Sequence, residues 1–307
     1  MPSRPTPASP PGPQEDDGRS AEPLAAWLES RGPAGGLSTK SSAVVHVLRT
    51  MPRTASYGGA GEIAAAAGVN VATVTRTAQA LGFPGWPALQ QELRARYLSS
   101  LSAPQVAAEH GPLTDAPGAA SLRRDIDDLA VLSRGTDLAA LRSLAQAIAG
   151  ARRTLVVASG SYTAVGQALA HNATLAGYDV HLHDGSTAAM VNALAATEPG
   201  DVVLSISFWR LYASAVQAAR VAGRQGATVW ALTDSASGPL AAAAQHVLVV
   251  PAEGVSFFPS LTPALAVVQA LCAELAAVDP ARTRARVAAA DAMWDEFGLL
   301  DRAPHRR

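Results

Sequence analysis

Residues 61–82 have the sequence GEIAAAAGVNVATVTRTAQALG, which decides the fold of the first part of the chain. Gly68 can adopt the positive φ that ends a helix, and Asn70 can cap the next helix by accepting a hydrogen bond from its first free N–H groups. Over residues 74–81, apolar side chains recur at i, i+4 and i+7, which is the spacing of one buried helix face. The stretch therefore predicts two short helices joined by a tight turn. The predicted buried face consists of Val74, Ala78 and Leu81, packed on Ile63 and Val69.

The opposite side of the second predicted helix carries short or hydrogen-bonding side chains, as a helix needs that enters the major groove of DNA. Residues 38–100 contain six Lys and Arg but only two Glu, although the whole chain has a formal net charge of −1. This local basic excess favours a double-stranded DNA partner over an ordinary helical hairpin with a polar solvent face. Arg76 could contact a guanine edge or a phosphate. The predicted DNA-binding residues are Asn70, Ala72, Thr73, Thr75, Arg76 and Gln79.

The composition indicates a folded, cytoplasmic protein. Of the 307 residues 49% are hydrophobic and only 16% are charged, so most of the chain should fold around cores. Cys272 is the single cysteine and lies in an apolar run, so neither a disulfide nor a Cys/His metal cluster is expected. Residues 1–20 contain no apolar stretch typical of a signal peptide, and no run approaches the roughly 20 apolar residues of a membrane span.

A second sequence pattern starts after residue 153, where short apolar runs alternate with helical stretches. Five such runs lie at 154–158, 180–182, 202–207, 228–232 and 247–250. The alternation predicts an α/β fold with a five-stranded parallel sheet flanked by helices on both faces. We expect a disordered tail at 1–21, an all-α helix-turn-helix domain at 22–101, a linker at 102–120, the α/β domain at 121–279, and a C-terminal helix and tail at 280–307.

Small and hydroxyl residues follow three of the predicted strands. In an open parallel sheet the strand carboxyl ends meet at one edge, where ligands bind, and helix N-termini there favour anions. For any single hydroxyl, helix capping is an equal alternative to ligand contact, but three such junctions at one edge favour a pocket. The predicted ligand-binding residues are Ser159, Gly160, Ser161 and Tyr162 after the first strand, Ser205, Ser207 and Arg210 around the end of the third, and Thr233 and Ser235 after the fourth.

Two segments carry a family resemblance. The first joins Ala64-x3-Gly68-Val69-Asn70-x-Ala72-Thr73-Val74-x-Arg76 to Leu81-Gly82-Phe83-x-Gly85-Trp86-x-x-Leu89. It resembles the N-terminal domain of the RpiR family of sugar-metabolism regulators, although that family usually has Ser in place of Asn70. Residues of about 120–279 resemble the sugar isomerase (SIS) domain, which follows in that family and binds phosphosugars. The resemblance implies a transcription regulator with a DNA operator, a phosphosugar-like effector, no cofactor, and a homodimeric or homotetrameric state.

The loop after the third predicted strand departs from that pattern. Members that bind a sugar phosphate usually have Ser-x-Ser-Gly-x-Thr there, whereas this chain has Ser207-Phe208-Trp209-Arg210-Leu211-Tyr212. In one interpretation Arg210 donates to a phosphate while Trp209 or Tyr212 stacks on the ligand. In the other, the domain fills its own pocket and mainly dimerises.

An isomerase with an accessory helical domain is the enzymatic alternative. Such an enzyme needs a base to move a proton between adjacent carbons, and the candidates are Glu253 and His171. Neither lies in a recognisable catalytic motif. We interpret His171 as a packing or dimer-interface residue and Glu253 as a solvated loop residue or a group that orients the ligand, and we expect no enzymatic activity. The linker and the helix at 122–133 are the predicted elements that transmit the effector signal.

Overall fold

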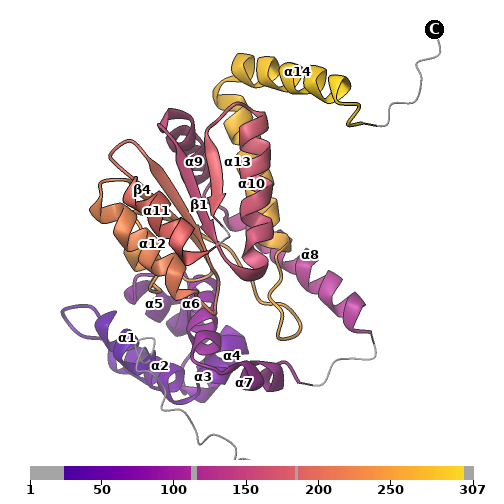
Figure 1. The fold of residues 1–307 in the computed structure, drawn as a ribbon. Helices are drawn as coiled ribbons and strands as arrows, with labels where there is room; N and C mark the ends of the chain where they lie inside the picture. The colour runs from indigo at the N-terminus through magenta and orange to yellow at the C-terminus, as the bar shows by residue number, and fades with distance from the viewer. Residues whose placement is uncertain (1–23, 112–115, 184–185, 301–307) are drawn as a thin grey trace, which may run out of the picture.

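The structure is a computed structural model that describes residues 24–111, 116–183 and 186–300. Its N-terminal part consists of short helices, and its C-terminal part is a sheet between helices (Figure 1). The predicted tail at 1–21 lies outside the described residues, as do the last residues of the chain. The N-terminal helices are α1 (Leu24–Ser30), α2 (Thr39–Thr50), α3 (Pro52–Tyr57), α4 (Ala60–Ala66), α5 (Val71–Ala80) and α6 (Trp86–Ser99).

The predicted helix pair is present as α4 and α5. Gly68 has φ +64°, and the side chain of Asn70 accepts a hydrogen bond from Thr73 N at 2.9 Å, so both ends of the turn form as expected. Val74, Ala78 and Leu81 are buried in one hydrophobic cluster with Ile63. The apolar spacing of the sequence therefore positions α5 on the other helices with its polar side outward.

The stretch expected to be a linker contains regular structure. Helix α7 (Ala103–Glu109) starts with a capping box, in which Ser102 N donates to the side chain of Gln105 at 2.7 Å. Helix α8 (Pro117–Gly135) then begins before residue 120. The linker prediction overlooked the capping signal, because Ala, Pro and Gly dominate the composition of this stretch.

Five strands form one parallel sheet in the order β2-β1-β3-β4-β5, which confirms the predicted fold class. They are β1 (Thr154–Ala158), β2 (Val180–His183), β3 (Val202–Ile206), β4 (Thr228–Thr233) and β5 (His246–Val249). The helices that complete the fold are α9 (Leu138–Gly150), α10 (Thr163–Leu175), α11 (Thr187–Ala195), α12 (Ala213–Arg224), α13 (Thr262–Val278) and α14 (Pro280–Glu296).

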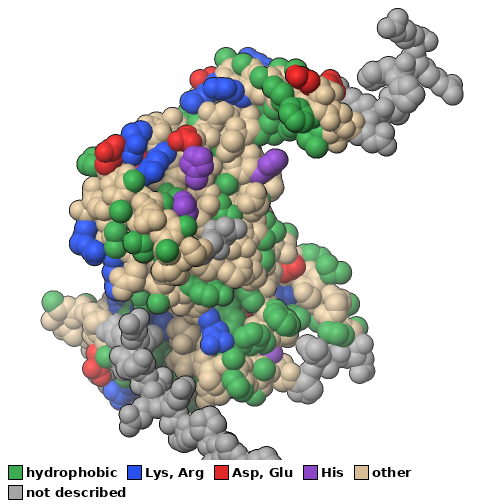
Figure 2. All heavy atoms as spheres, viewed as in Figure 1, with side chains coloured by type: hydrophobic (Ala, Val, Ile, Leu, Met, Phe, Trp, Pro, Cys, Tyr) green, Lys and Arg blue, Asp and Glu red, His purple; other side chains and the backbone are tan. Residues whose placement is uncertain are grey.

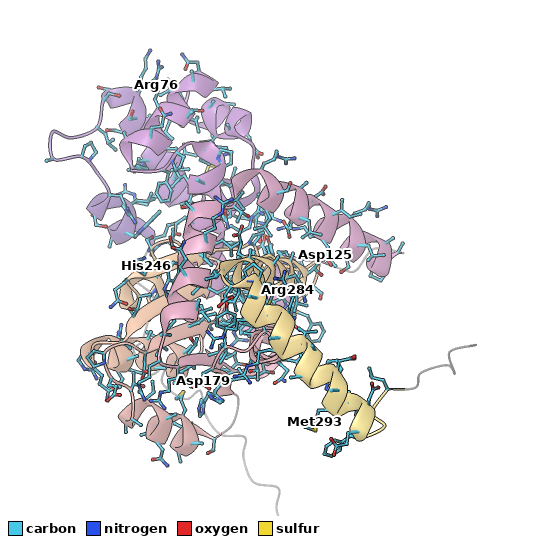
Figure 3. The ribbon with its side chains drawn as sticks, turned by 90° about the horizontal axis from the view of Figure 1, so that it is seen from above. Arg76, Asp125, Asp179, His246, Arg284 and Met293 are labelled. Atoms are coloured by element: carbon cyan, nitrogen blue, oxygen red, sulfur yellow. The ribbon has the colours of Figure 1, made fainter. Side chains whose placement is uncertain are left out.

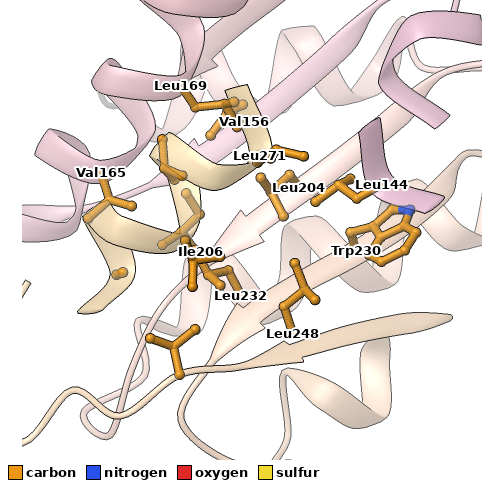
Figure 4. Packing of buried hydrophobic residues seen from close by; sticks show 14 of the residues in the cluster. Leu144, Val156, Val165, Leu169, Leu204, Ile206, Trp230, Leu232, Leu248 and Leu271 are labelled. Atoms are coloured by element: carbon orange, nitrogen blue, oxygen red, sulfur yellow. The ribbon is translucent and has the colours of Figure 1, made fainter. Parts of the chain in front are cut away.

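Alternate residues of each strand face opposite sides of the sheet and bury different helices. Val156, Leu204 and Leu232 pack in the cluster with α9, α10 and α13 (Figure 4). Val203 and Val229 pack in a second cluster with α12 and Leu194 of α11. Both sheet faces are thus covered, as nearly continuous apolar strands require.

Helix α14 extends away from the body of the molecule (Figure 1) and contains no buried residue. On the face drawn in Figure 2, hydrophobic side chains gather on it, and Val287, Met293 and the following Phe297 are exposed. Among the described residues no single helix is long and apolar enough to cross a membrane; α13 and α14 reach that length only as a pair bent by 107°.

Candidate functional site

Helix α5 presents the predicted DNA-binding residues unequally. Ala72, Arg76 and Gln79 are exposed, and Figure 3 shows Arg76 on the outer side of the helical domain, at the far end from the sheet. Thr73 is instead buried, and its hydroxyl donates to Asn70 Oδ1 at 2.9 Å. Arg76 Nη2 lies 3.3 Å from that hydroxyl and donates to it. The structure therefore gives Thr73 a positioning role for Arg76 rather than a place on the outer face.

The carboxyl ends of β1, β3 and β4 meet at one edge, as predicted for a ligand site. The loops there are bound to each other: Ser207 Oγ accepts from Tyr212 N at 3.1 Å, and Trp209 N donates to Asp234 Oδ1 at 2.9 Å. Burial raises the pKa of Asp234 to about 7, against the lowering effect of the Trp209 N–H. Ser205 has a packing role instead, because its fully buried hydroxyl donates to the carbonyl of Ala215 in α12.

Tyr212 covers the turn after β1. Gly160 has φ +60°, and a Cβ at this position would overlap the hydroxyl of Tyr212. The ring of Tyr212 also meets that of Tyr162 edge to face, at a centroid distance of 6.1 Å. Tyr162 itself is buried and donates to the carbonyl of Phe208 at 3.3 Å. The phenol ring of Tyr212 therefore occupies the space above the 159–161 turn.

Arg210 is exposed at the same edge and lies over the ring of Phe257, 5.8 Å from the centroid. Trp209 is buried against the same ring. Trp209 is therefore not free to stack on a ligand, whereas the guanidinium of Arg210 is accessible from solvent.

Glu253, on the loop after β5, is surrounded by groups from the N-terminal helices, from the segment expected to be a linker, and from α8. Tyr57 Oη donates to its Oε1 at 2.7 Å, and Arg124 Nη2 donates to its Oε2 at 3.0 Å. Arg94 Nε lies 3.5 Å from Oε2, and His110 Nε2 lies 3.3 Å from Oε1. We call these five residues the interdomain cluster. They bind the sheet domain to the helix-turn-helix domain.

The charges within the interdomain cluster shift the pKa values of Glu253 and His110. Burial alone would raise the pKa of Glu253, but His110, Arg94 and Arg124 together lower it below its ordinary value. The same contact with Glu253 raises the pKa of His110 above 6.5, against the opposing effect of burial. His110 Nδ1 bonds the carbonyl of Val106 at 2.8 Å and therefore carries a proton, so an ion pair between Nε2 and Glu253 at 3.3 Å requires a second proton on the ring.

Comparisons with known proteins agree with this architecture. A family model described as a helix-turn-helix domain of the rpiR family matches residues 31–100, and a SIS domain model matches residues 147–273. The sugar isomerase domain of an RpiR transcription factor from Sphaerobacter thermophilus is 30% identical, with a TM-score of 0.56, and the match covers 58% of this chain and 99% of that chain. The chain belongs to the RpiR family of transcription regulators.

A further solved structure is similar to this RpiR-family regulator over most of the chain. The Vibrio vulnificus NanR protein, complexed with ManNAc-6P, is 18% identical with a TM-score of 0.54, covering 91% of this chain and 100% of that chain. An Escherichia coli CFT073 protein in complex with A5P is also 18% identical, with a TM-score of 0.50, covering 56% and 94%. At these identities the likeness shows the fold alone. No curated protein matches the chain.

Sequence reasoning missed the contacts between the two domains of the regulator. Ser235, predicted to bind a ligand, donates to Glu92 of α6 at 2.8 Å, and Glu253 is a hub of interdomain contacts rather than a solvated loop residue. His171 is exposed and lines a groove between α10 and α14 with Arg286 and others. No group of three or more side chains that could hold a metal ion occurs among the described residues.

Proposed function

We propose that this regulator binds its operator through α5, that its SIS domain binds a phosphosugar or a related carbohydrate derivative, and that this effector modulates DNA binding. One observation carries the DNA-binding part: Arg76 and Gln79 stand on the exposed side of a capped helix whose other side is buried. The DNA-binding residues proposed for the groove are Ala72, Thr75, Arg76 and Gln79, with the exposed Asn70 at the start of the helix and the buried Thr73 beneath them.

An anionic carbohydrate fits the sheet edge by its chemistry. Hydroxyl groups, backbone N–H groups and the exposed Arg210 are donors for a phosphate or carboxylate. The structures of the NanR protein with ManNAc-6P and of the E. coli protein with A5P place ligands of this class on the same fold. The proposed ligand-binding residues at this edge include the exposed Gly160, Ser161 and Arg210, the half-buried Ser159 and the buried Thr233.

We further propose that the chain is not an isomerase and acts in the cytoplasm. The enzymatic alternative needs a free base, and Glu253 is already bound by Tyr57 and Arg124 of other elements. An isomerase assay with a panel of phosphosugars tests this directly. Turnover that Glu253→Gln abolishes would contradict the proposal.

A homodimer is the proposed assembly, because two recognition helices would then contact half-sites about one helical turn apart. The exposed apolar side chains of α14 and of Leu122 and Ile126 on α8 support it, since a monomer leaves them in water. Light scattering on the full chain tests the dimer. A monomer at micromolar concentration would contradict it.

The experiment for the whole function is DNA binding to the upstream region of the regulator's own gene, measured with and without hexose and pentose phosphates at fixed salt. We expect binding to change with at least one of them. Operator binding that no carbohydrate derivative alters, in the folded protein, would contradict the sensing function.

A further inference from the structure

The turn after β4, residues 235–237, surrounds a carboxylate of the other domain. Ser235 Oγ and Ser237 Oγ donate to Glu92 Oε1 at 2.8 and 2.6 Å, and Ala236 N donates to Glu92 Oε2 at 2.8 Å. Arg96 Nε donates a fourth hydrogen bond to this carboxylate, to Oε1 at 2.9 Å. Glu92 is 2% exposed. We call the donors of residues 235–237 the anion cradle.

The anion cradle has the chemistry of a phosphate site. Two hydroxyls and one backbone N–H converge on oxygen atoms of a buried anion, and a phosphate offers the same acceptors with more charge. The cradle also lies at the carboxyl end of a parallel strand, where ligands bind in such sheets. By contrast, the 159–161 turn at the same edge is covered by Tyr212.

The contact of Glu92 with the cradle is also a contact between domains. Arg96 Nη2 donates to the carbonyl of Ser237 at 2.9 Å, and Trp27 Nε1 donates to Ser237 Oγ at 3.1 Å. Glu92, Arg96 and Trp27 all belong to the helix-turn-helix domain. A group that takes the cradle from Glu92 therefore also removes these docking contacts and leaves the interdomain cluster around Glu253 as the second set that joins the domains.

We propose that residues 235–237 bind the phosphate group of the effector, and that Glu92 is an intramolecular competitor for this site. Phosphate binding displaces Glu92 and weakens the docking of the helix-turn-helix domain, which the interdomain cluster then holds alone. The inference rests on the proposed function, because it names the effector subsite of the same sensor domain.

Competition sets the affinity that an experiment measures. A ligand that binds only the open cradle has an apparent affinity reduced by the fraction of molecules in which Glu92 is displaced. A tethered carboxylate acts at an effective concentration of roughly millimolar or more, so this fraction is small. Removing the Glu92 charge should raise phosphate affinity at least about tenfold.

The test is a titration of the full chain with inorganic phosphate, followed by phosphorus NMR or calorimetry. We expect Glu92→Gln to bind phosphate at least about tenfold more tightly than the wild type, and Ser235→Ala in the same chain to remove the gain. Glu62→Gln is the matched control, since it removes the same charge from an exposed position of the same domain. Equal affinity of wild type and Glu92→Gln, or a gain that survives Ser235→Ala, would overturn the proposal.

A measurement on the wild type covers the case in which Glu92→Gln does not fold. Small-angle scattering with saturating phosphate should show a larger radius of gyration than without it, because the domain is then held by the interdomain cluster alone and opens away from the sheet more often. Phosphate binding without expansion would overturn the proposal. Both experiments omit DNA. A negative result in them contradicts the phosphate site but not effector-dependent operator binding, and an operator that responds to no effector does not affect the interpretation of the phosphate titration.

Discussion

Replacing Glu253 by Gln tests whether the interdomain cluster holds the two domains together. Gln keeps the shape of the side chain and one acceptor oxygen but removes the negative charge. In Glu253, Oε1 accepts a hydrogen bond from Tyr57 and Oε2 accepts one from Arg124. In the Gln variant an NH₂ group replaces one of these oxygens and would face a donor. Arg94 and His110, 3.5 and 3.3 Å away, would lose their counter-charge. We therefore expect the docked arrangement to weaken while each domain keeps its own core.

The magnitude follows from the burial of the partners. Removing one partner of a buried ion pair costs about 3–5 kcal/mol. The Glu253 side chain is 7% exposed, but that of Arg94, its cationic partner in the helix-turn-helix domain, is 26% exposed, so water screens part of the loss. We expect about 2–3 kcal/mol, which is a roughly 30- to 140-fold shift in the docking equilibrium.

Hydrogen exchange at Ala236 measures this shift at a distance from the substitution. The Ala236 N–H is bonded to Glu92 and not to the interdomain cluster, so its exchange reports opening of the whole domain contact. Glu253→Gln should accelerate exchange in the peptide containing Ala236 by about the same 30- to 140-fold. Glu198→Gln, at an exposed position of the sheet domain, is the control and should leave it unchanged. Unchanged exchange in a folded Glu253→Gln protein would refute the reasoning.

Three further predictions concern the other sites. Arg76→Ala should weaken operator binding by about 1–3 kcal/mol if the guanidinium reads a base, measured by fluorescence anisotropy at fixed salt, and unchanged affinity would contradict the assignment of α5. Tyr212→Ala should uncover the 159–161 turn, so that the hydrogen-bond donors of this turn become available to a ligand. The affinity for hexose phosphates, measured by calorimetry, should then rise by about tenfold. An unchanged affinity would show that the Tyr212 ring does not block the turn. The raised pKa of His110 means that its stabilising contribution is complete below pH 6.5 and disappears as pH rises through the higher value of the folded state. The thermal midpoint should therefore fall more steeply above pH 6.5 in the wild type than in His110→Asn, and parallel curves would contradict the proposed charge on His110.

Local patterns predicted most of the fold. The turn at Gly68 and Asn70, the buried face of α5 and the five strands depend on residues close in sequence, where periodicity and capping determine structure. The interdomain contacts could not be predicted in this way. Tyr57 and Glu253 are 196 positions apart, and nothing in the sequence around either residue indicates its partner. The sequence marked Ser235 as a ligand residue but could not show that Glu92 bonds its hydroxyl in the docked state, because a hydroxyl after a strand suits a carboxylate of the chain as well as a phosphate.

The two domain contacts are reciprocal, which bears on how an effector signal reaches DNA. Glu92 of the helix-turn-helix domain enters the edge of the sheet, and Glu253 of the sheet domain enters the N-terminal helices and linker. Coupling between effector and DNA therefore needs no long chain of contacts, since the proposed effector edge is itself the docking surface. Docking leaves Arg76 exposed, so release of the domain does not uncover α5. The effect on DNA must instead come from the relative placement of the two α5 helices in a dimer, because half-site spacing is fixed by the helical repeat of the operator.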